Sequence, residues 1–258
     1  MDNRYSRIFI VAIIILALVV SVAFVLFQKN IPKEPQVSIV DLLTKNAEIK
    51  IGNNTDTILV EFTDYACPFC ARFWLETFPM IKRNYIDTGK ITFIVRDYPI
   101  PQLHGVNPFY ASMYVKCVYK YIPDNNLYIV LSNKLYQNRT WMHYDYENLS
   151  HYLLNLMTFN ESIHNKIVDC YYYNDTSEEV YYDYQLGNEL QLIGTPSFFL
   201  LSTKLNDTGI KEIKDELKKY GLDIKVISDT YNGKNYYVIY FIGALPYEAF
   251  DFILKRAT

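Results

Sequence analysis

The chain has 258 residues, half of them hydrophobic, and a formal net charge of −3. A slightly acidic chain lacks the excess of basic residues that nucleic-acid-binding proteins carry, so we expect no nucleic-acid partner. Beyond an N-terminal apolar segment, about 230 residues remain, which is enough for one domain with insertions.

The N-terminal segment is predicted to cross a membrane. Residues 8–27 carry no charge, and Ser21 is their only polar residue; a run of this length spans a bilayer core as one helix. A cleaved signal peptide is the alternative, but its apolar core is usually shorter and ends in a small-residue cleavage pattern. We predict a cytoplasmic tail over 1–7, an anchor over 8–27, a linker and N-terminal extension over 28–50, and a domain over 51–258.

Two features favour an extracytoplasmic domain, and hence a single-pass cell-membrane protein with its N-terminus in the cytoplasm. The chain has four cysteines, an even number that suits an oxidising compartment. It also has more Asn-x-Ser/Thr triplets than expected by chance, which is typical of a glycoprotein surface. These triplets begin at Asn53, Asn138, Asn148, Asn160, Asn174 and Asn206.

The first elements of the domain alternate between strand and helix. Residues 57–63 form an apolar run typical of a buried strand, and residues 68–87 have helical apolar spacing that stops before Gly89. A second strand is predicted over 91–95. This order predicts a right-handed parallel crossover unit.

The rest of the domain is predicted to be a helical insertion followed by further strands. Helical spacing recurs over 111–121, 126–136, 146–156, 162–170 and 178–192, whereas 197–201 and 236–242 are typical of strands and 246–255 of a closing helix. We therefore predict an α/β fold with a mixed sheet and an all-helical insertion over about 103–192. A second insertion is predicted over about 202–235, with a charged helix at 211–219. It either helps to select the partner or substrate or is only an extension of a hairpin.

Cys67 and Cys70 are the candidate catalytic residues. They flank Pro68 and Phe69 where a predicted strand gives way to a helix, a spacing that marks a redox-active dithiol. With Pro68 at the first helical position, Cys67 is the N-cap, where free amides and the helix dipole stabilise a thiolate. Cys67 is then the nucleophile and Cys70, on the same helical face, the resolving thiol. Because no imidazole lies between them, Cys67 is expected to be less acidic and the couple less oxidising than with a histidine there.

A static disulfide and half of a zinc site are the alternatives for this pair. A bridge that closes so short a loop stabilises a fold little. Zinc needs four ligands, but Cys117 and Cys170 are isolated, and the four histidines show no paired ligand spacing. We therefore predict no metal site.

Four segments together resemble the DsbA-like branch of the thioredoxin superfamily. They are residues 60–70 with the two cysteines, residues 96–99 followed by His104, the Gly-Thr-Pro-Ser-Phe-Phe segment at 194–199, and residues 243–248. The resemblance covers nearly everything beyond residue 55 and implies a thioredoxin-like fold that performs thiol-disulfide exchange without an organic cofactor.

The resemblance also implies roles for residues around the dithiol. Pro196 matches the family's cis-proline, and Thr195 before it matches the position that tunes the nucleophile. Glu61 resembles the buried carboxylate that relays the proton of the resolving thiol; a glutamate at a solvated strand end is the alternative. His104 resembles a residue at a helix start and is expected to be structural. Pro68 and Phe69 complete the supporting set.

Cys117 and Cys170 match positions where many relatives carry cysteines. The resemblance therefore implies a structural disulfide between them, and two buried free thiols are the alternative.

The family further implies a monomeric enzyme that introduces disulfides into exported, cysteine-containing proteins. A membrane quinone-linked oxidase of the DsbB or vitamin K epoxide reductase type would reoxidise it. A disulfide isomerase or reductase of the same fold is one alternative, and a non-enzymatic membrane-tethered chaperone or binding module is the other.

Overall fold

The computed structural model describes residues 16–21, 24 and 37–258. One compact unit spans Ser38–Thr258, and in the N-terminal unit residues 16–21 and 24 are helical. Most of the predicted anchor over 8–27, the whole tail over 1–7 and the linker over 28–36 lie outside the described residues. Among the residues that are described, none belongs to a helix both long and apolar enough to cross a membrane.

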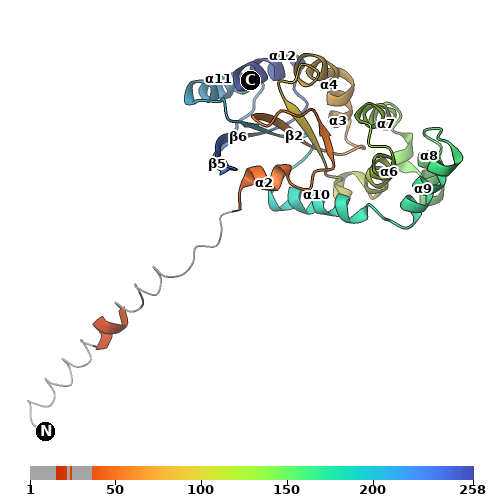
Figure 1. Cartoon of the computed structure of the whole chain (residues 1–258), viewed down its shortest axis with the longest axis horizontal. Coiled ribbons are helices and arrows are strands. Elements are labelled where there is room, and N and C mark those ends of the chain that lie inside the picture. Colours follow the sequence, from red (N-terminus) through yellow and green to blue (C-terminus); the bar gives the residue numbers. More distant parts are fainter. Residues whose placement is uncertain (1–15, 22–23, 25–36) are drawn as a thin grey trace, which may run out of the picture. The chain divides into compact units, whose positions relative to one another are not determined.

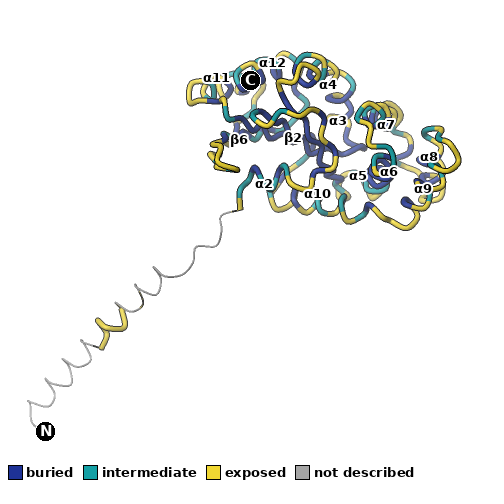
Figure 2. The backbone as a smooth tube through the Cα atoms, viewed as in Figure 1, coloured by how far each residue is buried: buried dark blue, intermediate teal, exposed yellow. Residues whose placement is uncertain are grey.

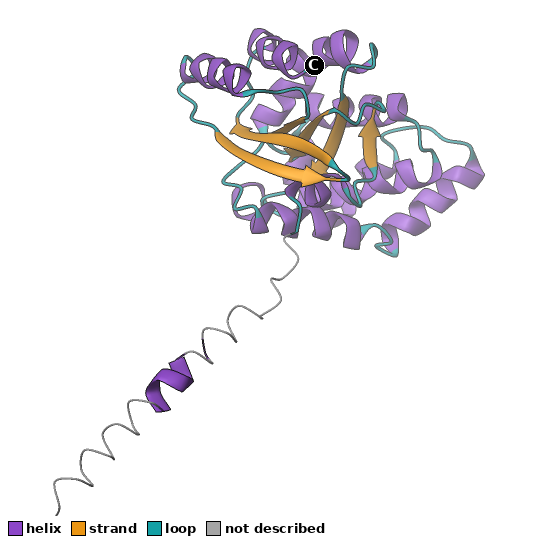
Figure 3. Cartoon of the chain, turned by 60° about the vertical axis from the view of Figure 1, so that its left-hand side comes forward, coloured by secondary structure: helices purple, strands orange, loops and turns teal. Residues whose placement is uncertain are grey.

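A mixed sheet forms the centre of the compact unit, as predicted (Figure 3). Its order is β1-β3-β2-β4-β6-β5, in which β2 and β3 are parallel and every other neighbouring pair is antiparallel. The strands are β1 (Ile49–Ile51), β2 (Thr57–Thr63), β3 (Thr92–Asp97), β4 (Ser197–Ser202), β5 (Lys225–Tyr231) and β6 (Lys234–Ile242).

The helix between β2 and β3 is continuous but irregular. It comprises α3 (Pro68–Arg72), a π-helical turn (Phe73–Thr77), α4 (Phe78–Ile81) and a second π-helical turn (Lys82–Ile86). Pro79 has no N–H to donate to the carbonyl four residues before it, and the Phe78 N–H bonds to the Phe73 carbonyl, five residues earlier. The missing donor accounts for a local change of helical hydrogen bonding at this point.

Helices cover both faces of the sheet (Figures 1 and 2). One face packs against α3, α4 and α12 (Tyr247–Ala257), with α11 (Asp207–Lys218) beside α12; the other packs against α2 (Ile39–Thr44) and α10 (Ser177–Glu189). Alternate residues of β2 point to opposite faces. Because both faces are covered, every residue of β2 is buried and the strand reads as an almost continuous apolar run.

The helical insertion follows β3, as predicted. It contains α5 (Pro101–His104), α6 (Asn107–Tyr121), α7 (Asn125–Gln137), a 3₁₀ turn (Thr140–His143), α8 (Tyr146–Leu154), α9 (Glu161–Tyr172) and α10. A disulfide joins Cys117 of α6 to Cys170 of α9 and closes a loop of 53 residues. His104 is the last residue of α5, so the prediction that it lies at a helix start is wrong.

The compact unit begins earlier than residue 51, the predicted domain boundary. The six-residue α2 precedes residue 51, the three-residue β1 ends at it, and both are part of the packed unit. Elements this short hold too few residues to show a periodic apolar pattern. We therefore predicted a linker and N-terminal extension over 28–50 in their place.

The insertion over 202–235 is a helix followed by a hairpin strand. After α11, β5 pairs with β6 through a turn at Asn232 and Gly233, which both have positive φ. Asn-Gly is the favoured pair for such a two-residue turn. We did not predict β5 because it is an edge strand that leaves most of its residues exposed, and so it lacks apolar alternation.

Four of the six predicted glycosylation asparagines use their side chains in local structure. Asn160 and Asn206 cap the first turns of α9 and α11, accepting hydrogen bonds from the N–H groups of Ile163 and Gly209. Asn138 accepts bonds from Thr140, and Asn148 donates to Asp145. Helix capping is therefore a sufficient physical reason for the asparagines at 160 and 206.

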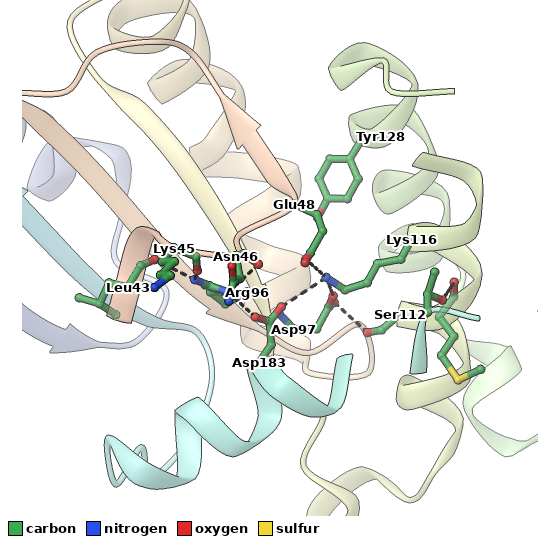
Figure 4. A network of polar contacts seen from close by, with 12 residues as sticks. Leu43, Lys45, Asn46, Glu48, Arg96, Asp97, Ser112, Lys116, Tyr128 and Asp183 are labelled. Carbon is green, nitrogen blue, oxygen red and sulfur yellow. Dashed lines mark hydrogen bonds and ion pairs between the residues drawn. The ribbon is translucent and has the colours of Figure 1, made fainter. Parts of the chain in front are cut away.

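A buried charge network ties the helical insertion to the sheet and to residues 42–48 (Figure 4). Arg96 of β3 pairs with Asp183 of α10 at 2.6 Å, and both side chains are at most 1% exposed. Lys116 of α6 lies 3.3 Å from both Asp97 and Asp183 and 2.6 Å from Glu48. The Arg96 guanidinium also donates to backbone carbonyls over 42–46. Charged groups are tolerated here because each has opposite charges and hydrogen-bond partners.

Asp183→Ala is expected to lower the free energy of unfolding by about 3–5 kcal/mol, because it leaves two buried cations without their shared carboxylate. Denaturant unfolding measures this change. The matched control is Asp175→Ala, which breaks the exposed pair with Lys120 and is expected to cost less than about 1 kcal/mol. Equal losses for the two variants would contradict the central role of the network.

Removing the Cys117–Cys170 bridge with a Cys117→Ala/Cys170→Ala variant is expected to cost about 4 kcal/mol, because the unfolded chain regains the freedom of a long loop. Denaturant unfolding of the variant and the parent without reductant gives the difference. A loss below about 1 kcal/mol would show that the bridge does not constrain the unfolded chain.

Candidate functional site

The two cysteines of the dithiol lie at the junction between β2 and α3. Cys67 is the N-cap of α3 with Pro68 at the first helical position, as predicted, and its carbonyl accepts the first helical bond from the Ala71 N–H. Cys70 follows on the first turn and is completely buried. The two thiols are free, so the structure shows the dithiol form.

The Cys67 thiol is unusually acidic. A hydrogen bond from the Cys70 thiol, together with bonds from Thr195 and from the backbone amides of Phe69 and Cys70, lowers the pKa of Cys67 to about 6 against the opposing effect of burial. The effect comes from hydrogen-bond donors at a helix N-terminus and needs no imidazole between the cysteines. This makes Cys67 a thiolate, and therefore a nucleophile, at neutral pH.

Cys70 and Glu61 form a buried pair with the opposite tendency. Burial raises the pKa of Cys70 well above its ordinary value, and the neighbouring charges of Cys67 and Glu61 raise it further. Burial likewise raises the pKa of Glu61. The Glu61 side chain is fully buried, with Oε2 accepting a bond of 2.9 Å from the Trp74 indole, which argues against a glutamate at a solvated strand end.

The Thr195–Pro196 segment lies beside Cys67. The peptide bond between these residues is cis, and the Thr195 carbonyl oxygen is 3.3 Å from the Cys67 Sγ. The Thr195 hydroxyl is buried and has no hydrogen-bond partner among the described side chains and backbone. Its hydrogen is therefore available to the Cys67 thiolate.

Residues remote in sequence hold the turn that precedes Cys67. We did not predict most of these residues from the sequence. Asp64 accepts bonds from the Ala66 N–H at 2.8 Å and the Ile100 N–H at 2.9 Å, and its Oδ2 lies 2.8 Å from Nδ1 of His104. Arg139, from the helical insertion, donates to the Ala66 carbonyl. His104 thus anchors the turn through Asp64, and the bond with Asp64 raises the pKa of its imidazole.

The chain matches the family model described as "Thioredoxin" over residues 44–219. The chain belongs to the thioredoxin family. The matched region begins in α2 and ends just after α11, so it includes both cysteines, the helical insertion and the Thr195–Pro196 segment.

Curated relatives of this thioredoxin-family chain have names that refer to disulfide chemistry. A probable disulfide bond formation protein D of Bacillus cereus is 26% identical over 62% of this chain and 74% of its own length. A putative protein-disulfide oxidoreductase of Rickettsia typhi is 39% identical, but the match covers only 20% of each chain. The chain thus spans about a fifth of the length of that relative.

Solved structures share the fold. The alpha-DsbA1 of Wolbachia pipientis superposes with a TM-score of 0.54 over 81% of this chain and 89% of its own, at 21% identity. The oxidised BdbD of Bacillus subtilis has a TM-score of 0.50 over 60% and 82%, also at 21% identity. At these identities the likeness establishes the fold.

The alkylation rate of the reduced native protein is expected to rise with pH through a midpoint near 6, because a lowered pKa leaves Cys67 ionised above that pH. Mass spectrometry is expected to show one fast modification at Cys67 and protection of Cys70, which is buried and has a raised pKa. A Cys67→Ser variant is the control and should lose the fast phase. A midpoint near that of an ordinary thiol would contradict the assignment.

Proposed function

We propose that the chain is a thiol-disulfide oxidoreductase that introduces disulfides into other proteins through Cys67 and Cys70. The observation that carries this proposal is the asymmetry of the pair. Cys67 is an acidic thiol beside the Thr195 carbonyl, whereas Cys70 is fully buried with a raised pKa. Both cysteines are buried, with Cys67 3% and Cys70 0% exposed, so the difference in acidity makes Cys67 the attacking or leaving sulfur and Cys70 the resolving one.

Each cycle transfers two electrons from substrate to enzyme. A substrate thiolate attacks Cys67 of the Cys67–Cys70 disulfide, which breaks that bond and leaves the electron pair on Cys70. A proton then neutralises the buried Cys70 thiolate, and Glu61 is placed to supply it. A second substrate thiolate attacks the mixed disulfide, and Cys67 leaves as a thiolate, so the substrate is oxidised and the dithiol reduced.

The acidity of Cys67 favours the oxidising direction. A low pKa stabilises the thiolate, and hence the reduced form, which makes the disulfide form the stronger oxidant. Hydrogen-bond donors supply this stabilisation although Pro68 and Phe69 are uncharged. We therefore favour an oxidase over an isomerase or reductase.

The surface around Cys67 suits an unfolded polypeptide as substrate. Large apolar side chains are exposed on three segments that meet at the site: Phe69 after Cys67, Leu103 next to His104, and Ile193 before Thr195, the last 84% exposed. A groove of about 660 Å³ continues from Phe69 and Thr195 along residues 242–246. Tyr220 and Leu222 of the insertion over 202–235 also line it, which supports a role for that insertion in substrate choice.

We further propose that the enzyme acts outside the cytoplasm, held to the cell membrane by residues 8–27, on exported proteins with free cysteines. The uncharged apolar run over 8–27 and the even number of cysteines support this setting. A membrane quinone-linked oxidase of the DsbB or vitamin K epoxide reductase type would restore the Cys67–Cys70 disulfide.

The decisive test is capture of substrate on Cys67. A Cys70→Ala variant of the full chain is first converted to its disulfide with a small thiol and then mixed with a reduced, unfolded protein that has a single cysteine. It is expected to form a mixed disulfide with that protein on Cys67, because neither Cys70 nor a second substrate thiol is present to resolve it. The Cys67→Ser/Cys70→Ala variant is the control. Undiminished refolding activity of a Cys67→Ser/Cys70→Ser variant would instead favour a chaperone.

Two further measurements on the full chain test the direction of thiol-disulfide exchange and the location of the domain. A reduction potential above about −220 mV against glutathione is expected for an oxidase, and a lower value would indicate a reductase.

Labelling of Cys67 in intact cells by a membrane-impermeant alkylating reagent is expected if the domain lies outside the cytoplasm, and protection of Cys67 would contradict that location.

A further inference from the structure

Each backbone polar group of Ala66 and Cys67 has a hydrogen-bond partner. The Ala66 N–H donates to Oδ1 of Asp64 at 2.8 Å, and the Ala66 carbonyl accepts a bond from Arg139. The Cys67 N–H donates to the Asp64 carbonyl at 3.0 Å, and the Cys67 carbonyl accepts a bond of 3.1 Å from the Ala71 N–H. Because the backbone of Cys67 is held on both sides, the point from which its sulfur projects is fixed.

The Asp64 carboxylate is held by both ends of the short helix α5. Its Oδ2 accepts a bond of 2.9 Å from the Ile100 N–H, just before the helix, and lies 2.8 Å from Nδ1 of His104, the last helical residue. The Asp64 side chain is completely buried, whereas the imidazole is 16% exposed. Two backbone N–H bonds favour the ionised carboxylate, which can only accept, so Nδ1 of His104 is the donor.

The helical insertion holds the same turn from a second side. The Tyr65 hydroxyl lies 3.1 Å from Oγ of Ser132 in α7. Arg139 follows the end of α7 by two residues, and Oδ1 of Asn138 accepts hydrogen bonds from the residue after Arg139, which fixes the direction of this loop. The guanidinium thereby reaches the Ala66 carbonyl although 73 residues separate the two.

We propose that Arg139 and His104 are positioning residues for the Cys67 sulfur in thiol-disulfide exchange. Arg139 acts through the Ala66 carbonyl, and His104 acts through Asp64. The proposal rests on the proposed function and extends it, because it assigns two residues of the helical insertion to the exchange step.

The position of the sulfur matters because its partners belong to other parts of the site. The Cys70 thiol, Thr195 and the amides of Cys70 and Phe69 donate to the Cys67 thiolate, and the Thr195 carbonyl oxygen is 3.3 Å from Sγ. Hydrogen bonds weaken steeply when their distance or angle departs from the optimum. A sulfur that moves relative to these donors is therefore expected to be less acidic and a poorer leaving group.

The titratable and charged groups that act on the His104 imidazole are Asp64, Cys67 and Arg139. The hydrogen bond with Asp64 is the largest influence and raises the pKa of His104. Burial lowers this pKa, the charge on Cys67 raises it and that on Arg139 lowers it. Both the charge of His104 and its bond to Asp64 thus act close to the turn, so the test separates the two.

Arg139→Met removes the donor to the Ala66 carbonyl and keeps a long side chain. The pH midpoint for alkylation of Cys67 in the reduced protein is expected to rise by about one pH unit, because hydrogen bonds to the thiolate are weakened. Near pH 5 the alkylation should slow about tenfold, whereas near pH 8 it should change less than about twofold, since the thiolate then predominates in both proteins. The equilibrium with glutathione near pH 8 should shift about tenfold toward the Cys67–Cys70 disulfide.

Conservative variants separate the hydrogen bonds from the charges. Arg139→Lys keeps a donor for the Ala66 carbonyl and should restore most of the parent's midpoint. His104→Leu removes the donor to Asp64 and should raise the midpoint by about half a pH unit, less than Arg139→Met because Asp64 keeps its bond from the Ile100 N–H. His104→Asn places an uncharged N–H donor near the position of Nδ1 and should restore the parent's midpoint.

Two control variants test for general effects. Lys134→Met removes a positive charge from an exposed position of α7. The Cys117→Ala/Cys170→Ala variant loosens the helical insertion without changing the turn. Both are expected to keep the parent's alkylation midpoint and its equilibrium with glutathione.

The results that overturn the proposal are specific. An Arg139→Met variant with the parent's midpoint and glutathione equilibrium would exclude a positioning role for the guanidinium. Equal midpoints for His104→Asn and His104→Leu, both above the parent's, would assign the effect to charge. An equal rise in the variant without the Cys117–Cys170 bridge would show a general loosening of the insertion.

Mass spectrometry of the alkylated proteins distinguishes the remaining outcomes. If Cys67 and Cys70 of Arg139→Met are labelled at equal rates, that variant is unfolded, and the two His104 variants then decide the proposal. If the parent itself shows no fast label at Cys67 and no exchange with glutathione, the proposed function fails. If the parent shows both while the folded Arg139 and His104 variants match it, only the present inference fails.

Discussion

The antiparallel pairing of β2 with β4 is the constraint on which the site depends. Residues 57–62 of β2 pair with residues 197–202 of β4, and this register brings the residues just before β4 next to the helix that follows β2. The Thr195 carbonyl thereby lies 3.3 Å from the Cys67 Sγ, although 128 residues separate them. A slip of one residue would reverse the facing of every side chain on a strand that is buried on both faces, so the register is strongly specified.

The two cysteine sulfurs lie in different environments near the N-terminus of one helix. Cys67, at the N-cap, receives hydrogen bonds from amides and from Thr195, whereas Cys70, one turn later, lies in the core beside Glu61. Two causes produce this difference: the free N–H groups of the first turn stabilise the Cys67 thiolate, and packing of the sheet and helices buries Cys70. Thiol-disulfide exchange is favoured by such an asymmetric pair, in which one sulfur ionises readily and the other stays protonated until it resolves the mixed disulfide.

The helical insertion contributes to the site as well as to stability. Arg139 holds the carbonyl before Cys67, and Tyr136 supplies a hydroxyl beneath Cys70. The insertion is itself fixed by the Cys117–Cys170 bridge and by the contacts of Lys116 and Asp183 with the end of β3 (Figure 4). Residues that position the dithiol therefore depend on packing between segments far apart in the chain.

The sequence was enough to predict the strand of 57–63, the helix that begins at Pro68 and the position of Cys67 at its N-cap, because local periodicity and capping chemistry are encoded in neighbouring residues. It did not determine α2, β1 or β5, which are short or exposed, nor the partners of Asp64, Glu61 and Thr63. Those features depend on packing, because hydrogen bonds between residues remote in sequence, and the burial that shifts the pKa values of Glu61 and Cys70, exist only after the sheet and the helical insertion have packed together.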